Sequence, residues 1–316
     1  MAEPLKILVC GDVCGKLKAL FGRVANILKK NKGFEMLLCV GSFFGTSQES
    51  EEEWRAYKSG TNTVPIPTYI LGPMEKLESS YFSEVSLENG GELCENVTYL
   101  GRKGILKTQS GVQIAYLSGV EKSEAPEDGC HFSQDDILAL ESQCQDESFK
   151  GLDILITSCW PRSVSQFASR PDGIDPDRCG SSQISRLAEQ LKPRYHFAGH
   201  EGVHYERAPY RNHQVLREAA QHVTRFISLA QVGNPDKKKD TTLSQNYFFD
   251  MSNTGNRQGG GNKRYGSHGT DSSNPKRPRK GPPPLKGSCW FCLGSPQVEK
   301  HLVVSVGDDV SGVISL

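Results

Sequence analysis

The chain has 316 residues, which is enough for about two domains at ~150 residues each. Its 37 Lys and Arg balance its 37 Asp and Glu, so a uniformly basic nucleic-acid coat and an acidic solvating tail are both excluded. No apolar run reaches the ~20 residues of a membrane span, and Gly11, Asp12 and Lys16 interrupt the apolar start of the chain, unlike a signal peptide. We therefore expect a protein that stays inside the cell, with reduced cysteines and no membrane partner.

Strands and helices are predicted to alternate along residues 1–232. Short apolar runs, most of them followed by a glycine, predict strands over 5–10, 36–40, 68–71, 112–117, 152–157, 195–198 and 224–229. Apolar residues at helical spacing predict a helix over 17–28, a capping pair (Ser133 with Asp136) predicts another, and a third is predicted over 182–191, ended by Pro193. This alternation predicts an α/β layered sheet.

Residues 233–288 differ in composition from the part before them. Eleven Lys or Arg stand against four Asp in this segment, together with a triple glycine, a triple proline and many Ser and Asn. Such a composition buries too little apolar surface to offset the entropy of ordering. We expect a basic disordered linker.

Polar or glycine-containing loops follow five of the predicted strands, at the strand ends where α/β sheets bind ligands. These loops are residues 11–15, 41–45, 72–75, 157–161 and 199–204. Their order and spacing resemble the calcineurin-like metallophosphoesterases. The resemblance implies a layered fold of that type. In the family, two divalent metals lie between these loops, bridged by an Asp of the second motif, and supply a hydroxide nucleophile.

Most of the family's metal ligands are replaced in this sequence. Asp12 and His200 retain the family residue, whereas the other family positions carry Cys14, Ser42, Pro73, Met74, Ser158 and Gly202, with a displaced His204 nearby. Ser42 stands at the bridging position, and a neutral hydroxyl does not supply the anionic bridge that two cations need. Pro73 has no polar side-chain atom, and the thioether of Met74 suits softer metals than those of a phosphatase.

We therefore predict that these nine residues form a vestigial cleft with no catalytic residue, no resident metal and no cofactor. A mononuclear metal site made by Asp12, Cys14, His200 and His204 is the alternative. His196 is predicted to be a core or cross-strand residue. Cys159 is a candidate reactive thiol, although no base lies near it in the sequence.

Three runs carry a closer resemblance: residues 6–13, 197–210 and 224–235 look like the CwfJ-type splicing factors. That family pairs a degenerate metallophosphoesterase domain, similar to lariat debranching enzyme, with a CwfJ region related to histidine-triad proteins. Residues 289–293 followed by His301 look like the start of the CwfJ region. The resemblance implies a degenerate domain over 1–232, the linker over 233–288, and a truncated start of the CwfJ region over 289–316.

Cys289, Cys292 and His301 have the spacing of part of a zinc site, although two free thiols are the favoured interpretation. Within the linker, Lys276, Arg277, Arg279 and Lys280 form a compact basic cluster. A basic cluster of this kind serves as a nuclear localisation signal or contacts RNA phosphates, and we expect the former.

The resemblance implies a nuclear, non-catalytic pre-mRNA splicing factor that associates with the spliceosome and assists the debranching or turnover of intron lariats. The partners it implies are spliceosomal proteins, lariat debranching enzyme and branched intron RNA. The alternative function is that of a divergent metal-dependent phosphodiesterase. Ser42, Pro73 and Met74 favour the first interpretation.

Overall fold

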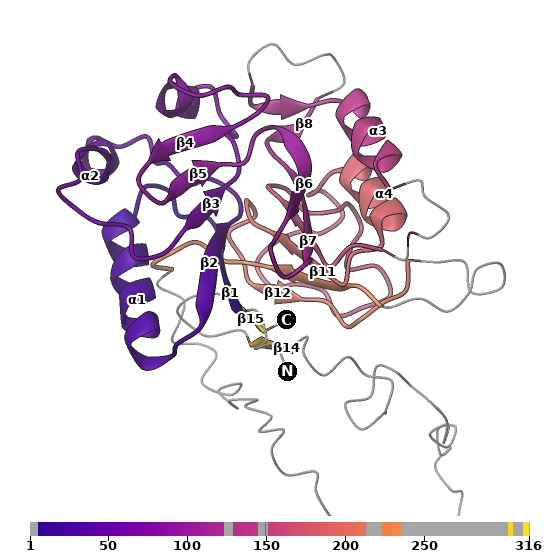
Figure 1. Cartoon of the computed structure of the whole chain (residues 1–316). Helices are drawn as coiled ribbons and strands as arrows, with labels where there is room; N and C mark the ends of the chain where they lie inside the picture. The colour runs from indigo at the N-terminus through magenta and orange to yellow at the C-terminus, as the bar shows by residue number, and fades with distance from the viewer. Residues whose placement is uncertain are drawn as a thin grey trace, which may run out of the picture. The chain divides into compact units, whose positions relative to one another are not determined.

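The computed structural model in Figure 1 describes residues 6–122, 129–144, 149, 151–212 and 223–234, and the backbone of two strands at 303–305 and 312–315. Three sequence predictions lie outside the described residues: nearly all of the basic linker, the zinc candidates and the nuclear localisation cluster. The described helices are too short or too polar to cross a membrane.

The helices and strands alternate along much of the chain. The helices are α1 (Leu17–Lys30), α2 (Gln48–Lys58), α3 (Gln134–Ser142), α4 (Ser182–Leu191) and a 3₁₀ turn, η1 (Glu78–Phe82). The strands are β1 (Lys6–Cys10), β2 (Phe34–Cys39), β3 (Thr68–Ile70), β4 (Gly91–Cys94), β5 (Val97–Tyr99), β6 (Lys103–Lys107), β7 (Gln113–Leu117), β8 (Val120–Glu121), β9 (His131–Phe132), β10 (Ile154–Thr157), β11 (Tyr195–Ala198), β12 (Tyr205–Glu206), β13 (Arg225–Ser228), β14 (Val303–Ser305) and β15 (Gly312–Ser315).

Two sheets hold most of these strands. The first has the order β14-β15-β1-β2-β3-β5-β4, and the second has the order β12-β13-β11-β10-β7-β6. The neighbours β1, β2, β3 and β5 run parallel, as do β7, β10, β11 and β13. Parallel neighbours place their carboxyl ends, and the loops that follow them, along one edge of each sheet.

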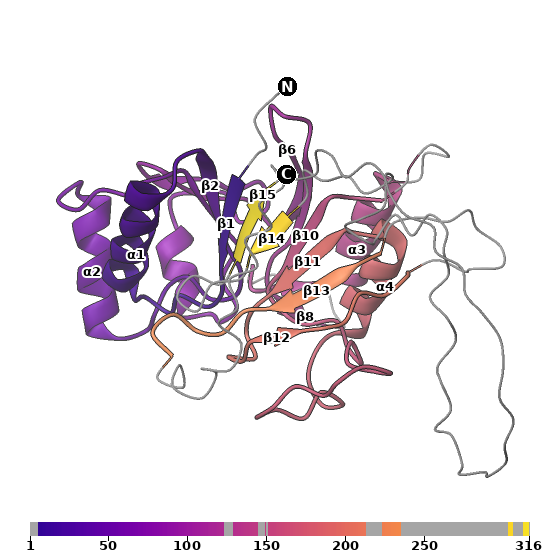
Figure 2. The same ribbon diagram turned by 90° about the horizontal axis from the view of Figure 1, so that it is seen from below.

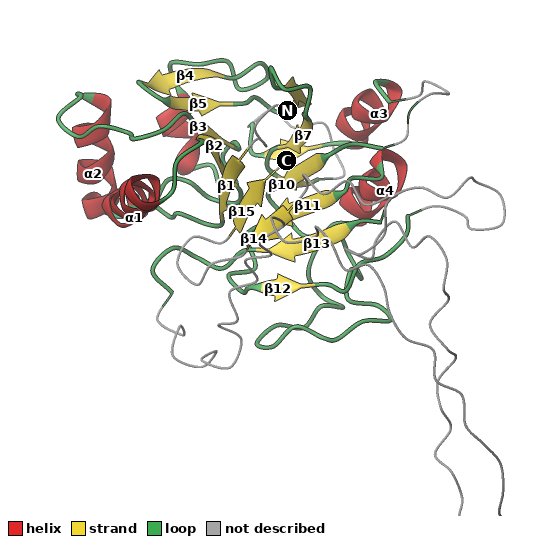
Figure 3. Ribbon diagram, turned by 60° about the horizontal axis from the view of Figure 1, so that its bottom comes forward, coloured by secondary structure: helices red, strands yellow, loops and turns green. Residues whose placement is uncertain are grey.

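The sheets form the two inner layers, and the helices cover their outer faces. Figures 2 and 3 show α1 and α2 on one side and α3 and α4 on the other. Because side chains alternate along a strand, Ile7 and Val9 join the core that also contains Ile156 of the second sheet. Leu8 faces the opposite way and packs with residues of α1 such as Leu17. The sheets are therefore apolar on both faces.

The sequence located most of the elements that build these layers. The seven predicted strands correspond to β1, β2, β3, β7, β10, β11 and β13, and the three predicted helices to α1, α3 and α4. The capping pair of α3 is confirmed, since the Ser133 N–H donates to the Asp136 carboxylate at 2.9 Å. The other strands, η1 and α2 were not predicted. In α2 only Trp54 and Tyr57 are buried, so the apolar pattern is sparse.

The strands near the C-terminus extend the first sheet. β15 pairs antiparallel with β1, with Ile7 opposite Ile314, and β14 pairs with β15. Both strands fall within 289–316, the segment predicted to be the start of the CwfJ region. β1 therefore has a hydrogen-bonded neighbour on each side.

Aromatic rings fill the space between α2, η1 and the first sheet. Phe82 is 2% exposed, and its ring centroid lies 5.3 Å from that of Phe44 and 4.9 Å from that of Tyr99. Phe44 also stacks on Tyr81 at 4.3 Å. This aromatic cluster anchors η1, which follows the loop after β3.

We expect Phe82→Ala to lower the free energy of unfolding by about 3–5 kcal/mol, because it removes a buried ring and leaves a cavity. Urea denaturation of the full chain measures the effect. Leu77→Ala, at a side chain that is 71% exposed, is the control and should change stability by less than about 0.5 kcal/mol. Equal, small effects of the two substitutions would contradict the packing described here.

Candidate functional site

The Asp12 carboxylate joins three of the predicted strand-end loops. Its Oδ1 accepts a hydrogen bond from the Ser42 N–H at 2.9 Å, and its Oδ2 accepts one from the His200 N–H at 2.8 Å. Asp12 follows β1, Ser42 follows β2, and His200 follows β11 of the other sheet. The structure thus brings Asp12, Ser42 and His200 together, and both carboxylate oxygens already serve backbone donors.

The approach of the loops leaves no room for a side chain at Gly41. This residue has φ +74°, and a Cβ there would lie 1.9 Å from Asp12 Oδ1. Gly199 meets Gly41 from the opposite sheet, since a Cβ on Gly199 would lie 3.0 Å from the Gly41 Cα. The glycines after β2 and β11 therefore permit backbone contact between the sheets.

Burial raises the pKa of Asp12, and the hydrogen bonds from the Ser42 and His200 backbones partly offset that rise. The side chain is 5% exposed. A buried carboxyl group lowers the stability of the fold when it is charged. The hydrogen bonds that Asp12 accepts offset this cost and hold the loops in place.

Glu78 is a second buried carboxyl group at this place, and sequence analysis missed it. Its Oε2 accepts a hydrogen bond from the Met74 N–H at 2.8 Å, and its side chain is bonded to that of Ser42. The residue is 6% exposed, and burial raises its pKa. Glu78 lies in η1, whose short turn has no strong periodic signal, so only its position soon after the β3 loop hinted at this role.

Cys14 occupies the turn between β1 and α1 with φ 49°. Its thiol is half-buried, and burial, with a further contribution from the charge of Asp12, raises its pKa to about 11. A thiol with such a pKa remains protonated at neutral pH, whereas a metal ligand or nucleophile is a thiolate.

The remaining vestigial-cleft residues take structural positions. Pro73 and Met74 are buried, and Met74 packs in the core between the second sheet and its helices. Ser158 is fully buried, and its carbonyl accepts the Gly199 N–H at 3.2 Å. Gly202 has φ +70° with open space around it. His204 is exposed, and its Nδ1 lies 2.9 Å from the Ser228 carbonyl oxygen.

The arrangement does not fit a metal centre. Among the residues that the structure describes, no three His, Cys, Asp or Glu side chains are grouped so as to hold a metal ion. The structure does not group Asp12, Cys14, His200 and His204 as the alternative mononuclear site would require. A dinuclear centre meets the further obstacle that Ser42 is neutral and that Asp12 has both oxygens bonded to the backbone.

The start of α1 is also bonded within the protein. The Lys18 N–H in its first turn donates to Glu53 Oε2 at 2.9 Å, and the Lys16 Nζ donates to the Val232 carbonyl at 3.0 Å. A phosphate group at this helix terminus would have to compete with the Glu53 carboxylate. Both contacts tie α1 to neighbouring segments.

His196 is a core residue, as predicted. It is fully buried, its Nε2 lies 2.8 Å from Thr157 Oγ1, and burial lowers its pKa to about 3. The Thr157 hydroxyl donates to the Cys159 carbonyl, so the neutral imidazole donates to Thr157. The thiol of Cys159 is also buried, and burial raises its pKa to about 12. This thiol therefore stays protonated and unreactive at neutral pH.

Two facing, largely parallel sheets with helices on their outer faces confirm the predicted layered α/β fold. Sequence comparison then identifies the particular relatives. CWF19-like protein 1 is 46% identical in Xenopus laevis and 44% in Homo sapiens over 96% of this chain, and the homologue in Drosophila melanogaster is 37% identical over the same share.

Residues 277–313 match the family model "Protein similar to CwfJ C-terminal". The resemblance to the CwfJ-type family predicted from the sequence is thereby confirmed. The chain spans 64% of the length of the Xenopus and human relatives. The matched segment includes the positions of Cys289, Cys292 and His301.

Two solved structures align with much of this chain at low sequence identity. The protein TT1561 of Thermus thermophilus has a TM-score of 0.46 and 12% identity, over 72% of this chain and 90% of that one. GAP50, the anchor in the inner membrane complex of Plasmodium, has a TM-score of 0.43 and 14% identity, over 72% of each chain.

We expect Glu78→Gln to stabilise the protein at pH 7. The amide can still accept from Met74 and bond to Ser42, but it carries no charge to desolvate. Because the folded-state pKa of Glu78 is raised, the charged carboxyl destabilises the fold at neutral pH, and this penalty disappears below the unfolded pKa of about 4.3. Urea denaturation of both forms at pH 7 and pH 4 measures the difference.

The gain from Glu78→Gln should therefore be present at pH 7 and absent at pH 4. The exposed Glu52→Gln is the control and should show neither effect. A loss of stability at pH 7 would mean that the ionised carboxylate stabilises this site.

Proposed function

We propose that this chain is a non-catalytic pre-mRNA splicing factor that associates with the spliceosome and assists lariat debranching enzyme in the debranching of introns. The relatives named CWF19-like protein 1 and the CwfJ C-terminal match support the splicing role. Lariat debranching enzyme, spliceosomal proteins and branched intron RNA are the proposed partners.

One observation carries the non-catalytic part of the proposal: both Asp12 oxygens accept backbone hydrogen bonds, one of them from Ser42 at the family's bridging position. Ser42 supplies no bridging charge, and Asp12 is already used to hold the loops. Phosphodiester cleavage by the family mechanism needs two metals that both polarise the phosphate and activate water. The residues here support binding and scaffolding in place of that chemistry.

The proposal is tested with the full chain, Mn²⁺ and a branched RNA that carries a 2′,5′-phosphodiester. The chain alone should release no linear RNA, because the family's metal ligands are replaced. Added to lariat debranching enzyme, it should raise the rate of debranching above that of the enzyme alone. Gel electrophoresis of labelled RNA measures both rates.

Bovine serum albumin at the same concentration controls for a non-specific effect on the enzyme. Cleavage by the chain alone that Asp12→Ala or His200→Ala abolishes would establish a divergent metal-dependent phosphodiesterase instead. An unchanged debranching rate would rule out the assisting role.

We also propose that the protein is nuclear and that Lys276, Arg277, Arg279 and Lys280 direct its import. Replacing these four residues with Ala in a fusion too large for passive diffusion should move the fluorescence from the nucleus to the cytoplasm. Replacing Lys237, Lys238 and Lys239 with Ala is the matched control and should leave the protein nuclear. If the variant with all four residues replaced by Ala stayed in the nucleus, the cluster would not direct import.

A further inference from the structure

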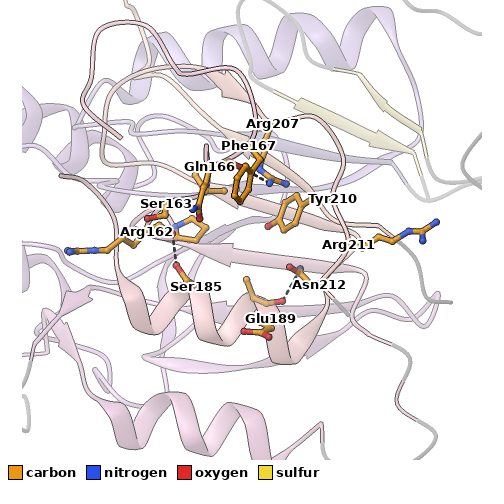
Figure 4. Close-up of a pocket in the computed structure, with 13 residues that line it drawn as sticks. Arg162, Ser163, Gln166, Phe167, Ser185, Glu189, Arg207, Tyr210, Arg211 and Asn212 are labelled. Atoms are coloured by element: carbon orange, nitrogen blue, oxygen red, sulfur yellow. Dashed lines mark hydrogen bonds between the residues drawn. The ribbon is translucent and has the colours of Figure 1, made fainter. Parts of the chain in front are cut away.

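A pocket of about 330 Å³ lies away from the loops around Asp12, between three segments of the second half of the chain (Figure 4). Its walls are the loop after β10 (residues 161–167), one side of α4, and residues 207–212 after β12. Ligand pockets in proteins usually measure about 300–1,000 Å³, so this one is large enough for a single nucleotide-sized group.

Arg207 is held inside the pocket by contacts on one side only. Its Cζ lies 3.8 Å from the centroid of the Tyr210 ring, and its Nη2 donates to the Gln166 carbonyl at 3.2 Å. Its Nε and Nη1 are buried and, within the described part of the chain, have no hydrogen-bond partner. Because these two nitrogens are buried and the third donates to Gln166, Arg207 gives the wall of the pocket positive charge and offers no free donor to a ligand.

The charge of the pocket favours an anion. Arg162, Arg207 and Arg211 line it, against the single carboxylate of Glu189. Arg162 bonds to the Gly180 carbonyl, which leaves its charge unneutralised. Arginine has a planar set of donors that matches the oxygens of a phosphate group.

Phe167 adds an apolar ring to the rim of this basic pocket. Its side chain is 98% exposed, and its φ of 60° lies in the left-handed region that non-glycine residues rarely adopt. Ser163 in the same loop has φ 58°. The loop thus presents a large apolar ring to solvent in a strained conformation, and such strain concentrates at binding sites.

We propose that this pocket binds single-stranded RNA, with a base stacked on Phe167, the adjoining phosphates bound by the exposed Arg162 and Arg211, and the buried charge of Arg207 adding to the attraction. An exposed aromatic ring beside arginines suits RNA better than an acidic peptide, because every base offers a flat face for stacking and a carboxylate does not. The choice of RNA rests on the proposed function in splicing. The site is separate from the loops around Asp12.

The test uses the full chain with Lys276, Arg277, Arg279 and Lys280 replaced by Ala, so that the basic linker cluster does not dominate binding. A fluorescein-labelled ten-nucleotide oligouridylate is the probe, and fluorescence anisotropy gives its Kd. Phe167→Ala should weaken binding about tenfold through loss of stacking. Phe167→Trp should retain binding, and Leu77→Ala, at another exposed apolar residue, should have no effect.

A charge variant tests the phosphate contacts. Arg211→Glu should weaken binding and reduce the slope of log Kd against log salt concentration by about 0.7, the value for one phosphate contact on a single strand. Arg55→Glu, at a side chain that is 69% exposed on α2, is the control and should leave that slope unchanged. Circular dichroism confirms that each variant is folded.

Three outcomes would overturn the proposal: no binding of the probe, equal affinity of Phe167→Ala and Leu77→Ala, or displacement of the probe by a ten-residue polyglutamate as readily as by unlabelled RNA. The last would define a general anion site. These outcomes are distinct from those of the debranching assay. Loss of the debranching effect with intact probe binding would refute the proposed function and leave the RNA site standing.

Discussion

The hydrogen bonds of one buried carboxylate, Asp12, determine how the two sheets meet at their carboxyl ends. Three loops from two sheets converge on this side chain, and two of them contact it through backbone N–H groups. The contact also requires glycine at position 41, because any side chain would clash with the carboxylate. Burial makes a charged Asp12 carboxylate unfavourable, and the hydrogen bonds from the Ser42 and His200 backbones offset that cost.

This constraint explains how the strand-end loops keep their arrangement without a metal ion between them. Asp12 and the backbone of position 200 hold the loops by a contact that needs no metal, so the fold tolerates Ser42, Pro73 and Met74 in these loops. Glu78 and Ser42 bond to each other beside that contact and fill part of the space between the loops. A scaffold of this kind leaves the outer loops free to form binding surfaces, as proposed for the pocket beside Phe167.

The sequence predicted the elements whose apolar pattern is strong and the contacts that follow from strand order. β1 and α1 have regular apolar patterns. The ends of parallel strands lie along one edge of a sheet, which predicts that Asp12 lies near Ser42. The family resemblance added His200, which follows a strand of the other sheet. The role of Glu78 could not be predicted from the sequence, because its partners depend on the fold of a short 3₁₀ turn. The pocket was missed for a similar reason, since Phe167 and Arg207 are distant in sequence and only the contact of the β10 loop with the segment after β12 makes them neighbours.

The pairing of β1 with β15 joins two strands that lie about 300 residues apart in the sequence. At a synthesis rate of about 5–20 residues per second, β1 leaves the ribosome long before its antiparallel neighbour exists. One edge of β1, with the apolar Ile7, Leu8 and Val9, is therefore unpaired while the rest of the fold assembles, and an open apolar edge is a template for aggregation. Closing such a long-range contact is slow, so we expect this edge of β1 to stay open until β15 has been synthesised.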